Sequence, residues 1–549
     1  MFNFSTKTLG LIGGAILFSG MSFAQVCGGS PQAAGVSLTL NVPPILERYE
    51  DTTALVSDIV LSCPAGTAAT GALVSTMSQN VTSKPLTSGG VALSEATLQI
   101  IQAGAVVNAY LGSVTGAQVT FSNVAFPAAA YIIRISNIRV NASAAGSGSV
   151  NVPITENLFV TNQGVAVFAT PTPVIVGYVE TGFATPALTT GVAVKNYVIC
   201  TANPVTTATT SFSATVKETF GGAFKAATSA GTCGVAPCTV TNGEGGSYTG
   251  GIGAGGATTV TGLGTATHGT RFELKFGNVP AGATIWLPTV ITNGPLTVTL
   301  GTAATGAISP ATANPPSGTS TIPAGDYGFT ATSGTASVYY DVTATDNTVL
   351  GESFDILGYV TAAANFVSTS QPAITLSIAP APLTPSTDIP TFNATPTVLT
   401  VSAFNICQTN LLFTYVTNQV GFETGIAISN TALDPYATAS SAKGTPGSCT
   451  LSLYGPGAPT ATKIATPSGF PTTLDVGNTG TFLLSSVPGI ATTGFSGYMI
   501  AQCNFLYAHG FAFIADALGN SNGTTMGYIA NVLPAVRSGI GATPEALLQ

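Results

Sequence analysis

The stretch FSNVAFPAAAYIIRI, Phe121–Ile135, holds the pattern that decides the fold. Two β-prone runs are separated by a proline, and the second run begins four residues after it at Tyr131. STIPAGDYGFTAT, Ser320–Thr332, repeats this spacing with Tyr327. In immunoglobulin-like sandwiches, a tyrosine that begins the penultimate strand hydrogen-bonds back to the preceding corner. We therefore expect repeated sandwich corners, although Pro-Ala-Gly turns are also common in a chain with 64 Gly and 34 Pro.

Short runs with a two-residue period surround these corners. Val, Thr, Ile and Phe dominate the runs, Gly, Pro and Asn separate them, and the three-four spacing of amphipathic helices is almost absent. The clearest runs are VSLTLNV (Val36–Val42), SFSATVKETF (Ser211–Phe220), RFELKF (Arg271–Phe276), SVYYDVTA (Ser337–Ala344) and AITLSIAP (Ala373–Pro380). The sequence therefore predicts an all-β protein of tandem immunoglobulin-like antiparallel β-sandwich domains with disulfides.

The N-terminal residues have the features of a secretory signal peptide. Lys7 is the only charge, Leu9–Phe18 is apolar, and small residues surround the expected cleavage site after Ala24. No later stretch is long and apolar enough to predict a membrane helix. We expect the mature chain to be secreted, either into the extracellular space or onto the cell surface.

Gly- and Pro-rich stretches set the expected domain boundaries, and the length allows three or four domains of about 150 residues each. The expected parts are a signal peptide over 1–24, a β-sandwich over 25–168, one or two β-sandwiches over 169–378 with a Gly-rich loop at 243–259, a Pro-rich linker over 379–397, a C-terminal β-sandwich over 398–534 and a loose tail over 535–549. Prolines in the linker favour an extended, semi-rigid backbone.

Eight cysteines, all after the expected signal peptide, fit an oxidising compartment. They are Cys27, Cys63, Cys200, Cys233, Cys238, Cys407, Cys449 and Cys503. Cys27 and Cys63 are alone in their region, so we expect them to pair, and Cys233 and Cys238 could close a short loop. Of the three in the C-terminal region, one is either free or paired with Cys200. No CxxC motif occurs, so we expect no zinc site.

Charge is scarce throughout the chain. Charged residues make up 6% of it, against about 25% in an average globular domain. With 13 Lys and Arg and a net charge of −8, no basic surface is available to neutralise phosphates, so we expect no nucleic-acid partner. A surface of Thr, Ser, Asn and Gly has little charge to keep copies apart, which favours self-association.

The densest group of charges is ERYEDTTALVSD, Glu47–Asp58. Its charged residues are Glu47, Arg48, Glu50, Asp51 and Asp58. They are weak candidates for a carbohydrate or cation site. The alternative, which we favour, is a solvated loop with a local Arg–carboxylate pair.

Catalytic residue types are few. The histidines are His268 and His509, and GNSNG around Ser521 lacks the strand–helix context of a nucleophile elbow. In GYMIAQCNFLYAHGFAFIADA, Gly497–Ala517, Cys503 and His509 would be roughly 20 Å apart along one strand. We interpret this stretch as a core strand or hairpin of the last sandwich, with Cys503 in a disulfide and a turn at His509. The sequence predicts no catalytic residue, no metal site and no cofactor.

Several segments resemble a family of large secreted β-sandwich proteins from acidobacteria and similar soil bacteria. They are CQTNLLFTYVTNQVGFETGIAISNTALDPY (Cys407–Tyr436), CTLSLYG (Cys449–Gly455), GYMIAQCNFLYAHGFAFIAD (Gly497–Asp516), LVSDIVLSCPAG (Leu55–Gly66) and RISNIRVNASA (Arg134–Ala144). The resemblance implies a secreted multi-domain β-sandwich protein and assigns no catalytic residue. The stretch from Glu47 to Cys63 departs from the family's usual Arg-Ala-Glu-Gly version, so the resemblance supports no site there.

These features favour a non-enzymatic structural or adhesive protein outside the cell, which could self-associate or form filaments. Its expected partners are other copies of itself, extracellular matrix or glycans. A filament subunit could donate VSLTLNVPPI or its C-terminal tail to a neighbour. The alternative is an extracellular carbohydrate-binding or glycan-active protein, which would need exposed tyrosines in a groove or a carboxylate pair, since Trp286 is the only tryptophan.

Overall fold

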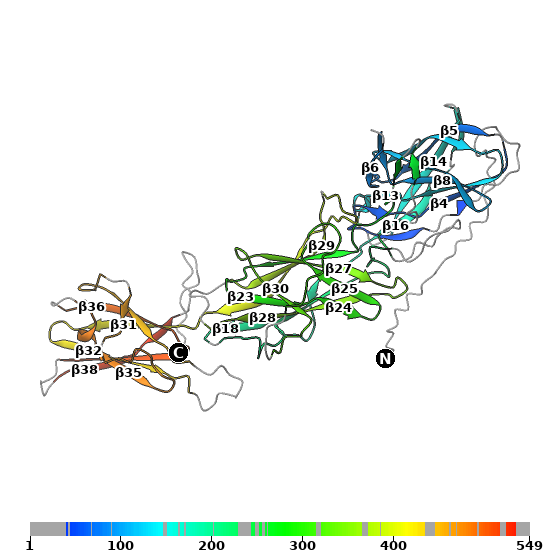
Figure 1. Cartoon of the computed structure of the whole chain (residues 1–549). Coiled ribbons are helices and arrows are strands. Elements are labelled where there is room, and N and C mark those ends of the chain that lie inside the picture. Colours follow the sequence, from blue (N-terminus) through cyan, green and yellow to red (C-terminus); the bar gives the residue numbers. More distant parts are fainter. Residues whose placement is uncertain are drawn as a thin grey trace, which may run out of the picture.

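The computed structural model describes residues 40–41, 44–66, 68–88, 91–146, 151–162, 165–169, 172–200, 202–228, 243–246, 252–254, 258–260, 262–314, 320–364, 372–384, 386–433, 445–460, 463–467, 469–490, 494–516 and 523–533. Within these ranges the protein has 39 β-strands, two short 3₁₀ helices and no α-helix. The strands form three sandwiches that follow one another along an elongated molecule (Figure 1). The expected signal peptide lies outside the described residues.

The first domain contains β1 to β16. One sheet has the order β1 (Leu40–Asn41), β4 (Ile59–Cys63), β12 (Tyr131–Ser136), β8 (Thr97–Gln102) and β9 (Ala105–Leu111). The other has the order β10 (Ser113–Thr115), β11 (Gln118–Phe126), β5 (Ala69–Met77), β14 (Val152–Asn162), β16 (Val174–Glu180) and β2 (Ile45–Arg48), with β15 (Val165–Ala169) beside β14. Smaller pairs are β3 (Ala54–Leu55) with β13 (Arg139–Val140) and β6 (Pro85–Ser88) with β7 (Val91–Ser94), and η1 covers Ala142–Ala145.

The second domain contains β17 to β30. One sheet has the order β17 (Ala187–Leu188), β19 (Phe212–Lys217), β28 (Ser353–Ala362), β23 (Ala283–Pro288) and β26 (Asp326–Thr330). The other has the order β18 (Lys195–Val198), β30 (Thr397–Asn405), β29 (Ile374–Ala381), β22 (Arg271–Gly277), β27 (Ala336–Ala344), β25 (Leu296–Gly301) and β24 (Val290–Asn293). The Gly-rich segment forms a separate hairpin of β20 (Ile252–Ala254) and β21 (Thr258–Val260).

The third domain contains β31 to β39. One sheet has the order β34 (Ile464–Ala465), β33 (Cys449–Tyr454), β36 (Ser496–Cys503), β31 (Thr409–Thr417) and β39 (Asn531–Leu533). The other has the order β35 (Thr479–Leu483), β32 (Phe422–Asn430), β37 (Ala508–Asp516) and β38 (Thr525–Ile529), and η2 covers Leu484–Ser486.

All three domains are immunoglobulin-like sandwiches, as the sequence predicts. Neighbouring strands are antiparallel except for one pair in each of the first two domains. There, β2 runs parallel to β16 and β18 runs parallel to β30, so a strand near the start of the domain pairs with the strand that ends it. The parallel pair closes one edge of each of these sandwiches.

Each domain has a hydrophobic core of its own. β22 shows how the two-residue period builds it, because Phe272, Leu274 and Phe276 are buried while Glu273 and Lys275 point outward. Fully burying a Phe or Leu side chain contributes about 1.5–3 kcal/mol. The separate cores mean that the domains can be treated as separate packing units joined at two junctions.

The sheets place the domain boundaries differently from the sequence analysis. β16 completes the first domain, which therefore extends to Glu180 and not to residue 168. The expected linker, 379–397, lies inside the second domain, because the strands on either side of it are paired neighbours. The change to the third domain falls at 406–408, between β30 and β31. Prolines mark a loop within a sheet as readily as a linker between domains.

The tyrosine-based corners are only half correct. Each quoted proline precedes a strand, as expected. However, the Tyr131 hydroxyl is buried and has no hydrogen-bond partner among the described residues, so it does not bond back to the corner. Tyr327 instead stacks on Phe329, with 5.9 Å between ring centroids. Turn residues, and not a tyrosine hydroxyl, shape these corners.

The stretch around Cys503 and His509 forms two strands, but not a hairpin. β36 and β37 belong to opposite sheets of the third domain, and the turn between them lies at 504–507, before His509. Cys503 is buried at the end of β36, whereas His509 is exposed on the outer face of β37. The predicted turn at His509 is therefore wrong, because residues 504–507 make the connection and β37 has already begun.

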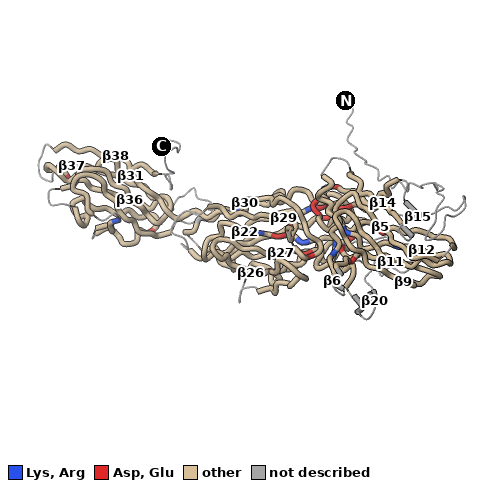
Figure 2. The backbone as a smooth tube through the Cα atoms, turned by 90° about the horizontal axis from the view of Figure 1, so that it is seen from above, with Lys and Arg blue, Asp and Glu red and all other residues tan. Residues whose placement is uncertain are grey.

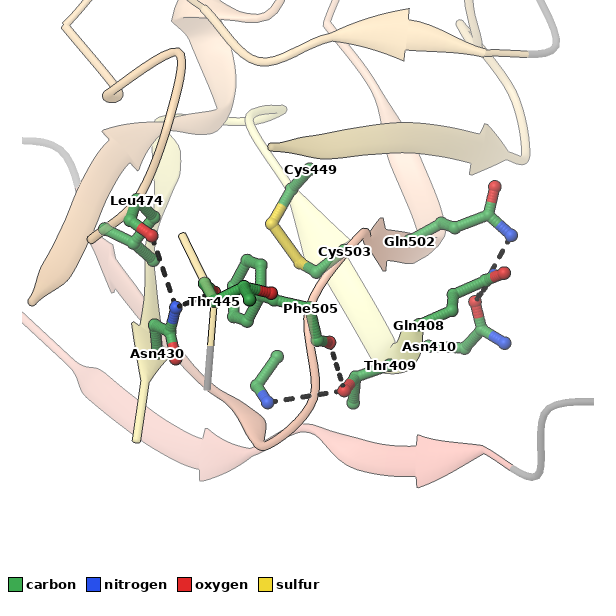
Figure 3. Close-up of a disulfide and its surroundings, with 11 residues drawn as sticks. Gln408, Thr409, Asn410, Asn430, Thr445, Cys449, Leu474, Gln502, Cys503 and Phe505 are labelled. Atoms are coloured by element: carbon green, nitrogen blue, oxygen red, sulfur yellow. Dashed lines mark hydrogen bonds between the residues drawn. A yellow bond between two sulfur atoms is a disulfide. The ribbon is translucent and has the colours of Figure 1, made fainter. Parts of the chain in front are cut away.

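Two disulfides join described cysteines. Cys449 on β33 faces Cys503 on β36, with 4.0 Å between Cα atoms (Figure 3). The other bond joins Cys200 to Cys407, which resolves the alternative left open for the third cysteine of the C-terminal region. Cys63 is also disulfide-bonded, and its expected partner lies outside the described residues, as do Cys233 and Cys238.

Candidate functional site at the first domain junction

Charged residues gather between the first and second domains (Figure 2). The group contains residues from both domains, and all but one have almost no exposed surface. Its members are Glu47, Arg48, Asp51, Glu95 and Arg139 of the first domain and Lys225 and Glu244 of the second. We call this group the junction cluster. In a chain with 6% charged residues, this concentration is the feature that most needs explaining.

Arg48 is the centre of the junction cluster. It is the last residue of β2, whose parallel pairing with β16 carries it to the end of the first domain. Its Nη1 donates to Glu244 Oε1 at 2.8 Å, to Thr270 Oγ1 at 2.7 Å and to the Ala223 carbonyl at 3.0 Å. Its Nη2 donates to Glu244 Oε2 at 3.0 Å and to Asp51 Oδ2. One guanidinium therefore binds both domains.

The surroundings of Arg48 keep it charged. Burial alone would lower the pKa of its guanidinium, but the carboxylates of Glu244 and Asp51 raise that pKa above its ordinary value. The guanidinium carbon also lies 5.2 Å from the ring centroid of Phe392 and 6.0 Å from that of Phe183. Aromatic faces attract a cation and exclude water from it. Arg48, Glu244 and Asp51 are thus buried together at the junction.

Arg139 makes a second set of contacts across the junction. Its Nε donates to Glu95 Oε1 at 2.8 Å, within the first domain. Its Nη2 donates to the backbone carbonyl of Glu244 at 2.7 Å, in the second domain. Glu95 Oε2 in turn accepts a hydrogen bond of 3.0 Å from the backbone N–H of Gly264. A side chain at Gly246 would collide with Asn137 of the first domain, which explains the glycine there.

A third contact joins Glu47 to Lys225. Lys225 Nζ donates to Glu47 Oε2 at 2.8 Å, and the carboxyl is fully buried while the lysine keeps slight exposure. Burial raises the pKa of Glu47, and the positive charge of Lys225 partly offsets that increase. Of the ion pairs among the described residues, this one and Arg48–Glu244 join the two domains.

The expected linker supplies the remaining contacts. Thr391 donates its backbone N–H to Thr53 Oγ1 at 2.9 Å, and its carbonyl accepts from the Thr52 N–H at 2.9 Å. The Asn393 N–H donates to the Glu50 carbonyl at 2.7 Å. The loop between β29 and β30 therefore lies against the first domain and connects it to the second.

The sequence analysis identified part of this group but misread its setting. The structure brings Glu47, Arg48 and Asp51 together, and the local Arg–carboxylate pair is present as Arg48–Asp51. The expected solvated loop is wrong, since these residues are buried by the second domain. Glu50 accepts from the Gly182 N–H at 2.9 Å, and Asp58 pairs with Arg134 inside the first domain instead.

Sequence reasoning missed the partners from elsewhere in the chain. These are Glu95, Arg139, Lys225 and Glu244. One signal was available, because Glu244 is the only Asp, Glu, Lys or Arg between Lys225 and Arg271. A single carboxylate in a long Gly- and Thr-rich stretch calls for a cationic partner, but the sequence does not say which one.

The junction cluster is suited to holding domains together. Its guanidinium and ammonium donors point at carboxylates and carbonyls of the protein itself. Among the described residues, no group of three or more His, Cys, Asp and Glu is placed to hold a metal ion. Removing one member of a buried ion pair leaves an uncompensated charge, at a cost of about 3–5 kcal/mol. The cluster therefore makes separation of the two domains costly.

The two histidines lie in different domains. His268 is buried in the second domain, its Nδ1 is 2.6 Å from the Gly269 carbonyl, and burial lowers its pKa. His509 is exposed on the third domain. Ser521 lies outside the described residues. Among the described contacts, neither histidine bonds to a serine or cysteine side chain.

The second junction is covalent. Val198 and Asn405 are partners in the parallel pairing of β18 and β30, and Cys200 and Cys407 follow them in the same register. The disulfide between these cysteines spans 207 residues of sequence. Only three residues separate β30 from β31, so the bond lies at the point where the second domain meets the third.

The chain matches no protein-family model and no curated protein. Among solved structures, it is similar to the C-terminal domain of the AgI/II polypeptide BspA of Streptococcus agalactiae, at 8% identity and a TM-score of 0.24, over 66% of this chain and 95% of that one. It is also similar to BcpA, the major pilin subunit of Bacillus cereus, at 10% identity and a TM-score of 0.18, over 83% of this chain and 95% of that one. It is similar as well to the major pilin SpaD of Corynebacterium diphtheriae, at 10% identity and a TM-score of 0.17, over 82% of this chain and 90% of that one. With identities and TM-scores this low, we base no functional conclusion on these similarities.

No helix within the described residues has the length and apolarity needed to cross a membrane.

Proposed function

We propose that this protein is a non-enzymatic extracellular structural or adhesive protein, in which three linked sandwiches act as a load-bearing spacer. The observation that carries the proposal is the position of the Cys200–Cys407 bond. Both cysteines lie just beyond the paired strands β18 and β30, and the bond closes a loop that contains nearly all of the second domain.

This position changes the route that a pulling force takes through the molecule. A force applied to the two ends of a chain normally passes through every residue. Here it crosses from Cys200 to Cys407 through the disulfide and bypasses the residues between them. The second domain is therefore protected from being unravelled, and it can keep its fold while the molecule is under tension. Such protection is useful to a tether and has no evident use in a freely diffusing enzyme.

The junction cluster supports the same role. Buried ion pairs between Arg48 and Glu244 and between Glu47 and Lys225 resist bending of the first domain against the second. With the loop around Thr391 also in contact, the first two domains have three sets of polar contacts and no long free linker. The junctions keep the domains in line and at a fixed spacing.

Single-molecule force measurement tests the proposal. The full chain is held by its two ends and stretched, with and without a reducing agent. At about 3.4 Å per residue, the 207-residue loop would add about 700 Å of extension once the bond is absent. We expect this extension only after reduction, because the intact bond keeps the loop closed.

A Cys200→Ser, Cys407→Ser double variant isolates this bond from the other disulfides. It should release the extra length without reductant, while a Cys449→Ser, Cys503→Ser variant should not release it. The second domain has a complete hydrophobic core of its own, so we expect the double variant to fold without this disulfide. Equal extension of wild type and double variant under oxidising conditions would refute the load-bearing role.

Carbohydrate binding is less well supported by the described surface. The stacked pair of exposed tyrosines, Tyr454 and Tyr498, lies on the third domain with 4.9 Å between ring centroids. Each ring therefore covers one face of the other, which leaves only the outer face of each ring for a sugar to stack on. The carboxylates of the junction cluster are buried and engaged.

A further inference from the structure

The last strands of the third domain are arranged differently from those of the first two domains. In the first domain β2 lies beside the last strand, β16, and in the second domain β18 lies beside the last strand, β30. In the third domain the last strand, β39, lies beside β31 in the other sheet, and no described strand pairs with the outer edge of β38.

Among the described residues, the outer edge of β38 has none of the usual protections. Sheet edges in natural proteins are commonly guarded by charged side chains, proline or bulges. No charged residue occurs from Ala517 to Val536, and β38 itself reads TMGYI. The edge strand β26 of the second domain differs, since the Asn314 side chain both donates to and accepts from the backbone of Gly328. The β38 edge is therefore free to accept another strand.

The sheet face next to this edge is apolar. Phe511 and Phe513 on β37 are each 44% exposed, and Ile529 on β38 is 73% exposed. Ile529 lies opposite Phe511 in the register, and Gly527 lies opposite Phe513. A Cβ atom on Gly527 would lie only 2.6 Å from the Phe511 ring, so that ring reaches over the glycine towards the open edge. Edge and face together form one apolar surface.

Two occupants from this chain can be compared, since Leu40 and Asn41 of the other candidate donor, VSLTLNVPPI, already pair with β4 of their own domain. The C-terminal residues 534–549 follow β39 directly, but they contain Pro534, Gly539, Gly541 and Pro544, which disfavour a strand. A second copy of β38 has no proline and no charge to repel the first copy. The face it would bring is the same apolar surface. Composition thus favours a second copy over the tail.

We propose that two copies of this protein associate by antiparallel pairing of their β38 strands about a two-fold axis at Gly527. This rests on the proposed structural role and names its partner. In this register Thr525 of one copy lies opposite Ile529 of the second copy, and the two four-stranded sheets become one continuous sheet. The two Phe511 rings flank the paired glycines. Cyclic two-fold dimers are the commonest soluble homo-oligomers, and a five-residue pairing is a small interface, so the dimer forms as concentration rises.

Sedimentation equilibrium of the full chain tests the dimer. Wild type should shift from monomer towards dimer with increasing concentration. Ile529→Lys places a charge on the edge and should keep the protein monomeric over the same range. Leu483→Lys is the matched control, because Leu483 is 45% exposed on β35, at the opposite edge of the same sheet. It should dimerise like wild type.

A cysteine pair tests the register. The Thr525→Cys, Ile529→Cys variant should form a covalent dimer under oxidising conditions on a non-reducing gel. Thr525→Cys alone should form far less, because residue 525 does not face its own copy in this register. A dimer that is unaffected by Ile529→Lys would overturn the proposal, and so would a monomer at every concentration.

Truncation after residue 534 tests whether the C-terminal tail occupies the β38 edge. If removal of the tail converts a monomer into a dimer, the tail is the occupant of the β38 edge in the native chain and the proposal is wrong. These results are independent of the force measurement, which depends on the Cys200–Cys407 bond. If the protein is a monomer at every concentration but its second domain is still protected in the force measurement, the dimer proposal is wrong and the proposed function is retained.

Discussion

The guanidinium of Arg48 hydrogen-bonds to residues of two domains. Its contacts with Asp51, Glu244 and Thr270 are all buried, and the rings of Phe183 and Phe392 lie beside it. In a protein with so few charges, their burial at a junction indicates that they serve to fix the geometry of that junction. A buried pair is not by itself a large gain in stability, but breaking it is costly.

Arg48→Met should destabilise the first junction. The change leaves the carboxylates of Asp51 and Glu244 buried without a cation, at a cost of about 3–5 kcal/mol. We expect lower resistance to urea and, in small-angle X-ray scattering, a wider range of angles between the first two domains. Arg134→Met is the matched control, because Arg134 pairs with Asp58 inside the first domain. It should lower stability without changing the scattering from the junction, and an equal change in both variants would contradict the role of Arg48.

Glu156 makes the folding stability of the protein depend on pH. It is fully buried in the first domain, and burial raises its pKa to about 7, although a 2.6 Å hydrogen bond from Ser75 Oγ opposes the increase. In the unfolded chain its pKa returns to its ordinary value of 4.5. The folded state therefore favours the protonated acid. The contribution of Glu156 to the free energy of unfolding is fully present below about pH 4.5 and is lost as pH rises through about 7.

Glu156→Gln should remove this loss. The amide stays neutral and can still accept the Ser75 hydrogen bond. We expect the variant to be more stable than wild type at pH 8.5 by about 3 kcal/mol, and nearly equal to it at pH 4.5, in urea unfolding. Parallel stability curves for the two proteins across this range would show that Glu156 does not titrate as described.

At the scale of elements, the strands were predictable and their assembly was not. The two-residue period located β19, β22, β27 and β29 within a few residues, because alternation reports directly which side chains face the core. The boundary of the last domain was missed because prolines in 379–397 mark a loop that returns to the same sheet. Which strands pair depends on contacts between distant residues, and a single sequence carries little information about these.

The candidate site shows the same division. Composition picked out the group at Glu47–Asp58, because charges are rare elsewhere. It could not show that Glu244, 196 residues from Arg48, completes the cluster. The open edge of β38 is a property of the same kind, since it depends on which strands pair and is visible only in the assembled sheets.

At the scale of the whole molecule, the two junctions are built from different chemistry. The first uses buried ion pairs and a docked loop, so it depends on folded side chains remaining in place. The second uses a covalent bond beside a very short connection. Figure 1 shows the result as a line of three domains.

The Cys200–Cys407 bond also determines what a protease can accomplish. A single cut anywhere in the backbone between these residues leaves both fragments attached through the sulfurs. A cleavage site placed at the exposed turn of Leu350 should therefore give two bands on a reducing gel and one band of full mass on a non-reducing gel. Release of a separate fragment without reductant would contradict this connectivity. In the proposed extracellular setting, where proteases are common, a nicked copy would still keep its outer domains joined.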